Sequence, residues 1–209
     1  MLGKQRMHRG DTLIEVLFAI TTMSLVIILS LSLMNQGTAA SVRSLQITLV
    51  RQQIDSQAET LRFLNSAYVA AYSSGTPVVA GTTSPAKVYR AILDDVESKG
   101  ATSVSAFGGT SSSTCSGAPS GSFILNTRAA RYQAYSTSKL VAAETYPQVV
   151  YNTDGTISTS QGLWIEAVRS GASGGSRYTD FHIRACWGAL GMSQAMNIGT
   201  IVRLYDPAN

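Results

Sequence analysis

The sequence predicts an α+β protein in which one long N-terminal helix packs on an antiparallel β-sheet. The chain from Asp11 to Tyr72 contains no proline and a single glycine, Gly37. Residues 12–34 are almost wholly apolar, and the C-terminal half carries short β-prone runs bounded by turn residues. With 209 residues, the chain is long enough for such a helix and for one domain with a core of its own.

The first predicted element, the apolar run 12–34, is long enough to cross a membrane. At about 1.5 Å per residue, a helix of this length matches the hydrocarbon core of roughly 30 Å. Lys4, Arg6 and Arg9 precede the run, and no Lys or Arg follows until Arg43. This bias predicts a cytoplasmic N-terminus and places residues from 35 onward outside the membrane.

One carboxylate, Glu15, lies inside this apolar run. An ionisable group in a bilayer costs about 2–4 kcal/mol on insertion scales, so it marks a function by default. A cleaved secretory signal has a shorter apolar core, and a lipoprotein signal has a cysteine directly after its core. A plain signal anchor fits the length of the run but leaves Glu15 unexplained.

The residues before and around Glu15 form a recognisable pattern. A short basic leader ends in Gly10, and the next residues are Asp11, Thr12, Leu13, Ile14 and Glu15. This pattern resembles the class III signal of type IV pilins and pseudopilins. In that family a prepilin peptidase cuts after the glycine, on the cytoplasmic side of the membrane, and usually methylates the new N-terminus. Asp11 stands where the family usually has Phe, which leaves its methylation open.

The resemblance implies a pilin-like organisation of the whole chain. Its parts are a cleaved leader (1–10), a transmembrane and filament-core helix (11–34), an amphipathic helix (35–72) and a globular head (73–209). Assembly then uses Thr12, Leu13, Ile14 and Glu15, with the Glu15 carboxylate paired to the N-terminal amine of a neighbouring subunit. The single-pass precursor starts in the cytoplasmic membrane and ends in an extracellular filament, as a homo-oligomer or together with other pilins.

The function implied by the resemblance is that of a major or minor pilin. Such a structural subunit of a type IV pilus serves adhesion, twitching motility or DNA uptake. Two alternatives remain open at this point. One is a pseudopilin of type II secretion, and the other is a membrane-anchored extracellular binding domain that does not polymerise.

Beyond the membrane segment, the helix is predicted to be amphipathic. Its apolar residues recur at three- and four-residue steps: Ile47, Val50, Ile54, Ala58, Leu61, Leu64, Tyr68 and Tyr72. This stripe predicts the face on which the head packs. Gly75 and Pro77 are expected to end the helix.

The head is predicted to contain one short helix followed by strands. Ser84, Pro85 and Gly100 bound a helix over 85–99, whose buried face carries Val88, Ile92 and Val96. Residues 101–122 are a loop rich in small residues, and turns are expected at 152–155 and 171–176. Strands are predicted at 123–126, 146–152, 162–169, 177–187 and 199–205. Residues 127–145 carry no pattern that predicts a structure.

The two cysteines, Cys115 and Cys186, are predicted to form a disulfide, because the head is expected to lie outside the cell. The bond closes a loop of roughly 70 residues, worth on the order of 4 kcal/mol in the chain-entropy model. Strand alternation places Phe181, Ile183, Ala185 and Trp187 on the face toward the helix. Cys186 then lies on the opposite face, beside Arg184 and His182.

No catalytic, cofactor or metal site is predicted, and we expect the protein not to be an enzyme. His8 belongs to the leader, so the processed chain has only His182, and no nucleophile motif surrounds any serine. Two cysteines and one histidine make no zinc set, and there is no phosphate loop. The acids Asp94, Asp95 and Glu97 are interpreted as a solvated helix face.

The charge of the chain gives weak support to nucleic-acid binding. Of the formal charge of +4, three positive charges lie in the first ten residues, which leaves 13 positive and 12 negative side chains in the remainder. Arg128, Arg131 and Lys139 are the candidates for DNA capture by the head. A nearly balanced head predicts that such binding is weak.

Overall fold

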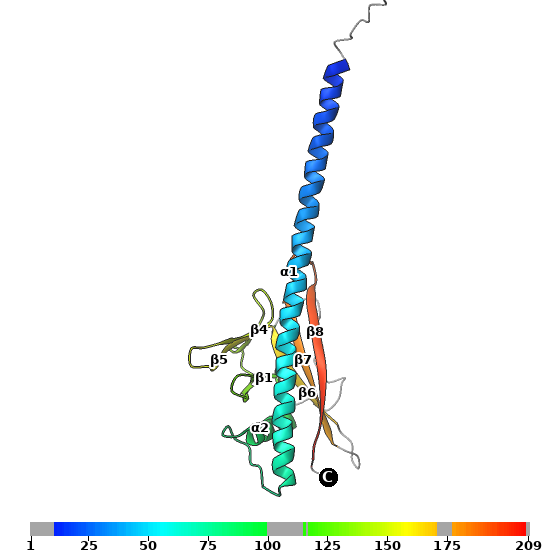
Figure 1. Ribbon diagram of the computed structural model, residues 1–209. Coiled ribbons are helices and arrows are strands. Elements are labelled where there is room, and N and C mark those ends of the chain that lie inside the picture. Colours follow the sequence, from blue (N-terminus) through cyan, green and yellow to red (C-terminus); the bar gives the residue numbers. More distant parts are fainter. Residues whose placement is uncertain (1–10, 100–114, 116, 171–176, 208–209) are drawn as a thin grey trace, which may run out of the picture. The chain divides into compact units, whose positions relative to one another are not determined.

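The computed structural model describes residues 11–99, 115, 117–170 and 177–207, with side chains from Leu13 onward. The chain divides into two compact units, Met1–Ser44 and Leu45–Asn209. We call the first the N-terminal unit and the second the head unit. The predicted α+β class is confirmed, with one long helix and a largely antiparallel set of strands (Figure 1). Gly10, Gly100, most of the 101–122 loop and the 171–176 turn lie outside the described residues.

Helix α1 runs from Asp11 to Ser73 and contributes to both units. It ends in the predicted segment, where Gly75 adopts a left-handed φ of 72° and the Thr76 amide donates to the Ala71 carbonyl. In the head unit, the predicted apolar stripe is buried from Val50 to Tyr68. The prediction is wrong for Tyr72, which is 46% exposed, because the packed core stops about one helical turn before it.

Helix α2 spans Pro85–Lys99, as predicted, and buries Val88, Ile92 and Val96. The Val88 amide donates to the Ser84 carbonyl and so closes the first turn. The interpretation of Asp95 as solvated is wrong. Its side chain is only 18% exposed, because the Tyr132 hydroxyl donates to its carboxylate and Lys99 pairs with it at 2.6 Å.

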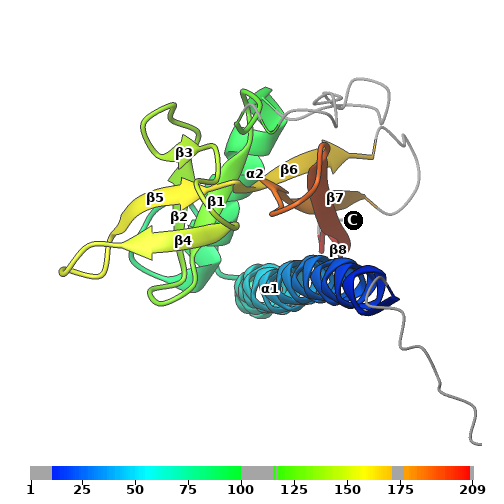
Figure 2. The ribbon, with the colours of Figure 1, turned by 90° about the horizontal axis from the view of Figure 1, so that it is seen from above.

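The strands of the head unit form two sheets. Their bounds are β1 Phe123–Asn126, β2 Arg131–Ala134, β3 Leu140–Val141, β4 Gln148–Tyr151, β5 Ile157–Gln161, β6 Leu163–Arg169, β7 Tyr178–Gly188 and β8 Ala195–Tyr205. The five-stranded sheet has the order β2-β1-β6-β7-β8 and is antiparallel throughout. The second sheet, β3-β5-β4, was not predicted and includes a parallel pair, β3 with β5 (Figure 2).

Gly162 joins the two sheets, because it separates β5 from β6. Its amide donates to the Val141 carbonyl in one sheet, and its carbonyl accepts from the Cys186 amide in the other. Its φ is +59°, and a Cβ at this position would lie 2.4 Å from the Cys186 carbonyl oxygen. Only glycine therefore fits this corner without moving the backbone.

A buried glutamine, Gln57, ties α1 to strand β1. Its side chain is fully buried, its amide nitrogen donates to the Leu125 carbonyl at 2.9 Å, and its oxygen accepts from the Leu125 amide at 3.0 Å. The side-chain amide thus replaces a strand partner for one residue of β1. It satisfies two backbone groups that would otherwise be buried without a partner.

Candidate assembly segment and disulfide

The first part of α1 is apolar on every side and exposed on every side. All side chains from Leu13 to Thr38 are exposed, and the large apolar ones between Leu13 and Met34 keep 49–70% of their surface accessible. This helix is long and apolar enough to cross a membrane by its length and composition. A helix that is hydrophobic all round is normally surrounded by lipid or by other protein.

Four hydroxyl groups in this segment are satisfied by the helix itself. Thr21, Thr22, Ser24 and Ser30 donate to backbone carbonyls three or four residues earlier, at 2.8–3.0 Å. An unpaired hydroxyl in hydrocarbon costs free energy, and these bonds remove much of that cost. These four Ser and Thr residues are thus compatible with lipid, whereas the charged group of the run, Glu15, still has to be explained.

The predicted assembly residues gather at the start of α1. Asp11 and Thr12 are its first two residues, Leu13 and Ile14 are 65% and 69% exposed, and Glu15 follows them. Within the described part of the chain, no side chain or backbone group pairs with the Glu15 carboxylate. The next basic residue along the chain, Arg43, is 28 positions away. In helical form that separation is about 42 Å, so Arg43 cannot neutralise Glu15 in the same subunit.

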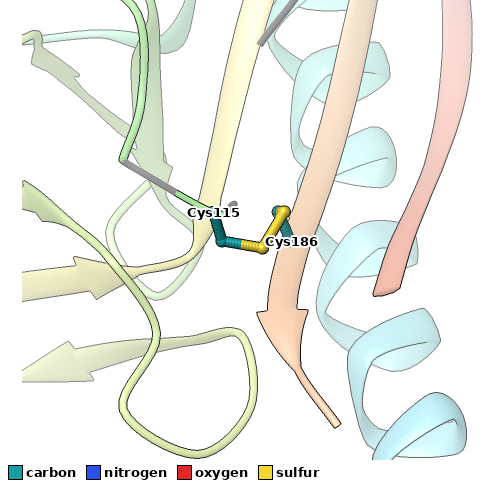
Figure 3. Close-up of a disulfide and its surroundings, with 2 residues drawn as sticks. All are labelled: Cys115 and Cys186. Carbon is teal, nitrogen blue, oxygen red and sulfur yellow. A yellow bond between two sulfur atoms is a disulfide. The ribbon is translucent and has the colours of Figure 1, made fainter. Parts of the chain in front are cut away.

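The predicted disulfide between Cys115 and Cys186 is present, with a Cα–Cα distance of 5.5 Å (Figure 3). It joins residues 71 positions apart and attaches Cys115 to strand β7. The predicted alternation along β7 is also confirmed. Phe181, Ile183 and Trp187 are fully buried, and the Trp187 indole donates to Gln46 of α1 at 3.2 Å.

The outer face of the five-stranded sheet carries the single described histidine. His182 lies opposite Glu166 in the β6–β7 pairing and lines a shallow depression of about 310 Å³ with Arg184, Asn197 and Gly199. Burial lowers the pKa of His182, and the Arg184 charge lowers it further. Among the described residues, no three His, Cys, Asp or Glu side chains are placed to hold a metal ion.

The basic residues proposed for DNA capture have different surroundings. Arg128 stacks over the Tyr151 ring at 4.1 Å, and Lys139 donates to the Ile157 carbonyl at 2.9 Å. Arg131 is exposed at the start of β2. Two of the three side chains therefore make contacts within the head, which reduces their availability for a phosphate backbone.

The described residues thus comprise an exposed apolar helix with one carboxylate and a disulfide-bonded head. In comparisons with known proteins, no family model, no curated protein and no solved structure matches this chain.

Proposed function

We propose that this chain is the precursor of a type IV pilin-like filament subunit. In this proposal it is cut after Gly10, anchored in the cytoplasmic membrane by residues 11–34, and polymerised through that helix into a filament on the cell surface. One observation carries the proposal. Glu15 follows a glycine-terminated basic leader, lies in an exposed apolar helix, and has no partner among the described residues.

The missing partner is the physical basis for assembly. A carboxylate in the bilayer costs about 2–4 kcal/mol, and pairing with an amine of a neighbouring subunit recovers part of that cost. Cleavage after Gly10 creates such an amine on Asp11. Any register that leaves the two groups unmatched is penalised, so the pair would fix the axial position of one subunit on the next.

Asp11 gives this pair a local competitor. Its position is four residues before Glu15, so the two residues lie on the same helix face. Two acids at this spacing repel each other, whereas the positive end of the helix dipole favours acids in the first turn. The Asp11 carboxylate also stands beside the new amine. The proposal therefore includes a three-group cluster of two acids and one amine rather than a simple pair.

The intact mass and N-terminal sequence of the protein sheared from the cell surface test the processing step. We expect a chain that begins at Asp11, with or without a methyl group, and a mass two hydrogens below that of the reduced form. A Gly10→Leu variant is the control and should retain its leader. A sheared protein that begins at Met1, or one that begins near Ser41 after removal of the preceding residues as an ordinary secretory signal, would exclude prepilin processing.

Glu15→Gln tests the assembly step. We expect membrane insertion to be kept, while surface filaments fall at least about tenfold, since a loss of about 1.4 kcal/mol already changes an equilibrium by that factor. The matched control is Glu59→Gln, on the head part of the same helix, because its ion pair with Arg62 is exposed and worth little. Unchanged filaments in Glu15→Gln would favour the non-polymerising anchored domain.

A further inference from the structure

Strand β8 is an edge of the five-stranded sheet, and its second side is open. It stands last in the order β2-β1-β6-β7-β8 and pairs with β7 over all 11 of its residues. The other edges of the two sheets are much shorter, since β2 and β4 have 4 residues each and β3 has 2. Among the described strands, β8 is therefore the one long open edge of the head unit.

The hydrogen bonds of the sheet show which backbone groups of β8 point away from β7. The Asp206 amide donates to the Arg177 carbonyl at 2.9 Å, one residue beyond the pair Tyr178–Tyr205. In an antiparallel ladder, hydrogen-bonded pairs alternate with pairs that share no hydrogen bond, so the even-numbered residues of β8 bond β7. The odd-numbered residues direct their N–H and C=O groups outward: Ala195, Asn197, Gly199, Ile201, Arg203 and Tyr205. Within the described part of the chain, these groups have no hydrogen-bond partner.

This edge lacks the features that commonly prevent a further strand from pairing. Those features are proline, lysine, a β-bulge or a very short strand. Strand β8 contains neither proline nor lysine, and its register with β7 is continuous. Its one charged residue, Arg203, is held by β7, because its guanidinium donates two bonds of 2.7 Å to Asp180 and stacks over the Tyr178 ring at 4.0 Å. Such an edge is a template for strand addition.

A second copy of β8 is complementary to this edge. When two copies run antiparallel about a two-fold axis at Thr200, residue 195 of one copy lies opposite residue 205 of the other, and the strands overlap over their full length. The odd-numbered residues then lie opposite one another, so every outward N–H and C=O group finds a partner. A shift by two residues in either direction shortens this overlap and leaves groups unpaired.

The side chains also match in this register. On the face that packs toward α1, Ile198 lies opposite Val202 of the second copy, and the two Thr200 side chains lie opposite each other. Both are favourable cross-strand pairs. On the other face, Arg203 lies opposite Asn197, so no like charges are directly opposed.

We propose that two copies of this chain associate through β8 and join their five-stranded sheets into one. The inference goes beyond the proposed function and does not depend on it. A two-fold pair cannot repeat along a filament whose subunits all point the same way. In the proposed filament it would therefore link subunits of two different filaments, whereas the Glu15 contact acts within one.

Disulfide trapping in the full chain, solubilised in detergent and unassembled, tests the pair and its register. The variant is Thr200→Cys, because opposite residues that share no hydrogen bond have Cα atoms about 4.5 Å apart, within the range of a disulfide. The matched control is Ile198→Cys, on the same face of the same strand. In the expected register its two copies are four residues out of line, about 13 Å apart, which is too far for a disulfide.

We expect mild oxidation to give at least about fivefold more covalent dimer with Thr200→Cys than with Ile198→Cys. Glu15→Gln in the Thr200→Cys chain should leave this yield unchanged, because β8 and not the apolar helix makes the contact. Equal yields from the two cysteine variants overturn the inference. A dimer that disappears with Glu15→Gln also overturns it, since association would then depend on the assembly segment.

Sedimentation equilibrium of the full chain in detergent gives a second test without added cysteines. Ile201→Lys changes a side chain that is 60% exposed and brings two lysines close together across the pair. We expect it to raise the dissociation constant of the dimer at least about tenfold. Leu190→Lys, at a 62% exposed apolar residue outside β8, is the control and should leave the constant unchanged. A parent chain that stays monomeric, or a dimer unaffected by Ile201→Lys, overturns the inference and leaves the proposed filament function standing.

Discussion

The two parts of α1 have the same secondary structure and opposite surroundings. From Leu45 to Ser73, in the head unit, the helix buries one stripe and exposes a charged face that includes Arg51 and Asp55. From Leu13 to Ser44, in the N-terminal unit, no side chain is fully buried, and only Ala39 and Arg43 are half-buried. Helix propensity alone therefore explains neither half, because the same backbone conformation occurs with one buried face in the head unit and with exposed side chains around the helix in the N-terminal unit.

The apolar surface that the N-terminal part exposes is large. Fifteen large apolar side chains between Leu13 and Met34 are exposed. At about 1.5–3 kcal/mol for each, their transfer out of water is worth on the order of 20 kcal/mol or more. That exceeds the net stability of an ordinary domain, about 5–15 kcal/mol. The head unit has a buried core of its own, whereas the N-terminal part has the exposed apolar surface that the proposed membrane and filament environments would cover.

Removal of the disulfide is expected to give the largest difference in stability between the head and the helix at 13–34. The double variant Cys115→Ser, Cys186→Ser should lower the free energy of unfolding of the head by about 4 kcal/mol. The helix at 13–34 should remain helical in detergent micelles. Tryptophan fluorescence reports the head alone, because both tryptophans lie in β6 and β7, while circular dichroism reports both regions. Simultaneous loss of both signals would show one cooperative unit instead of two.

Two leucines on α1, one in each unit, allow a direct comparison of how much each part of the helix contributes to the stability of the head. Leu61→Ala should lower the free energy of unfolding by about 2–5 kcal/mol, because Leu61 is fully buried in the head core. Leu17→Ala, at a side chain that is 55% exposed, should leave the head unchanged. Denaturant unfolding of both variants in micelles, followed by tryptophan fluorescence, is the measurement. A comparable loss for Leu17→Ala would show that the N-terminal part supports the head.

The features that the sequence predicted correctly depend on a periodic apolar pattern or on residues that start or end a helix. The stripe from Val50 to Tyr68 follows the helical period, and Ser84 and Pro85 mark the start of α2. The alternation of side chains along β7 predicted the face of the sheet on which Cys186 lies. These features are local, and each depends on residues within about one or two turns of helix or one strand.

Features that depend on distant partners could not be read in this way. Gln57 looks like an interruption of an apolar stripe, and only the approach of β1 shows why an amide belongs there. Strands β3 and β5 are short, and β5 is largely polar, so their pairing leaves no apolar pattern. Leu190 and Met192 resemble core residues in the sequence, and their exposure at a turn follows only from the fold.

Gln57 also provides a test within the head part of α1. Gln57→Leu keeps the size of the side chain but leaves the Leu125 amide and carbonyl buried without partners. We expect a loss of about 2–3 kcal/mol in the free energy of unfolding. The control is Gln52→Leu, at an exposed position on the same helix, which should change stability by less than about 0.5 kcal/mol. Equal effects of the two substitutions would contradict a specific role for the Gln57–Leu125 pair.

The smallest expected effect is on the pH dependence of stability and concerns Glu166. This carboxylate is buried in the head unit, whereas Glu15 lies in the exposed part of α1. Glu166 is 7% exposed, accepts from the Trp164 indole at 2.6 Å, and lies 3.9 Å from the Arg184 guanidinium. Burial raises its pKa, although the indole and Arg184 act in the opposite direction. The folded state therefore holds this proton more tightly than the unfolded state, and the associated stability is lost as the pH rises through the folded pKa.

Glu166→Gln should consequently gain stability relative to the parent chain as the pH rises from about 4 to 7. The glutamine oxygen can still accept from the Trp164 indole. Glu97→Gln is the control of opposite sign, because the hydrogen bond and charge of Arg169 lower the pKa of Glu97. Its stabilising contribution is present above the usual pKa, so this variant should lose stability relative to the parent over the same range. Urea unfolding at several pH values measures both slopes, and slopes of the same sign would show that Glu166 is not held as a buried carboxyl group with a raised pKa.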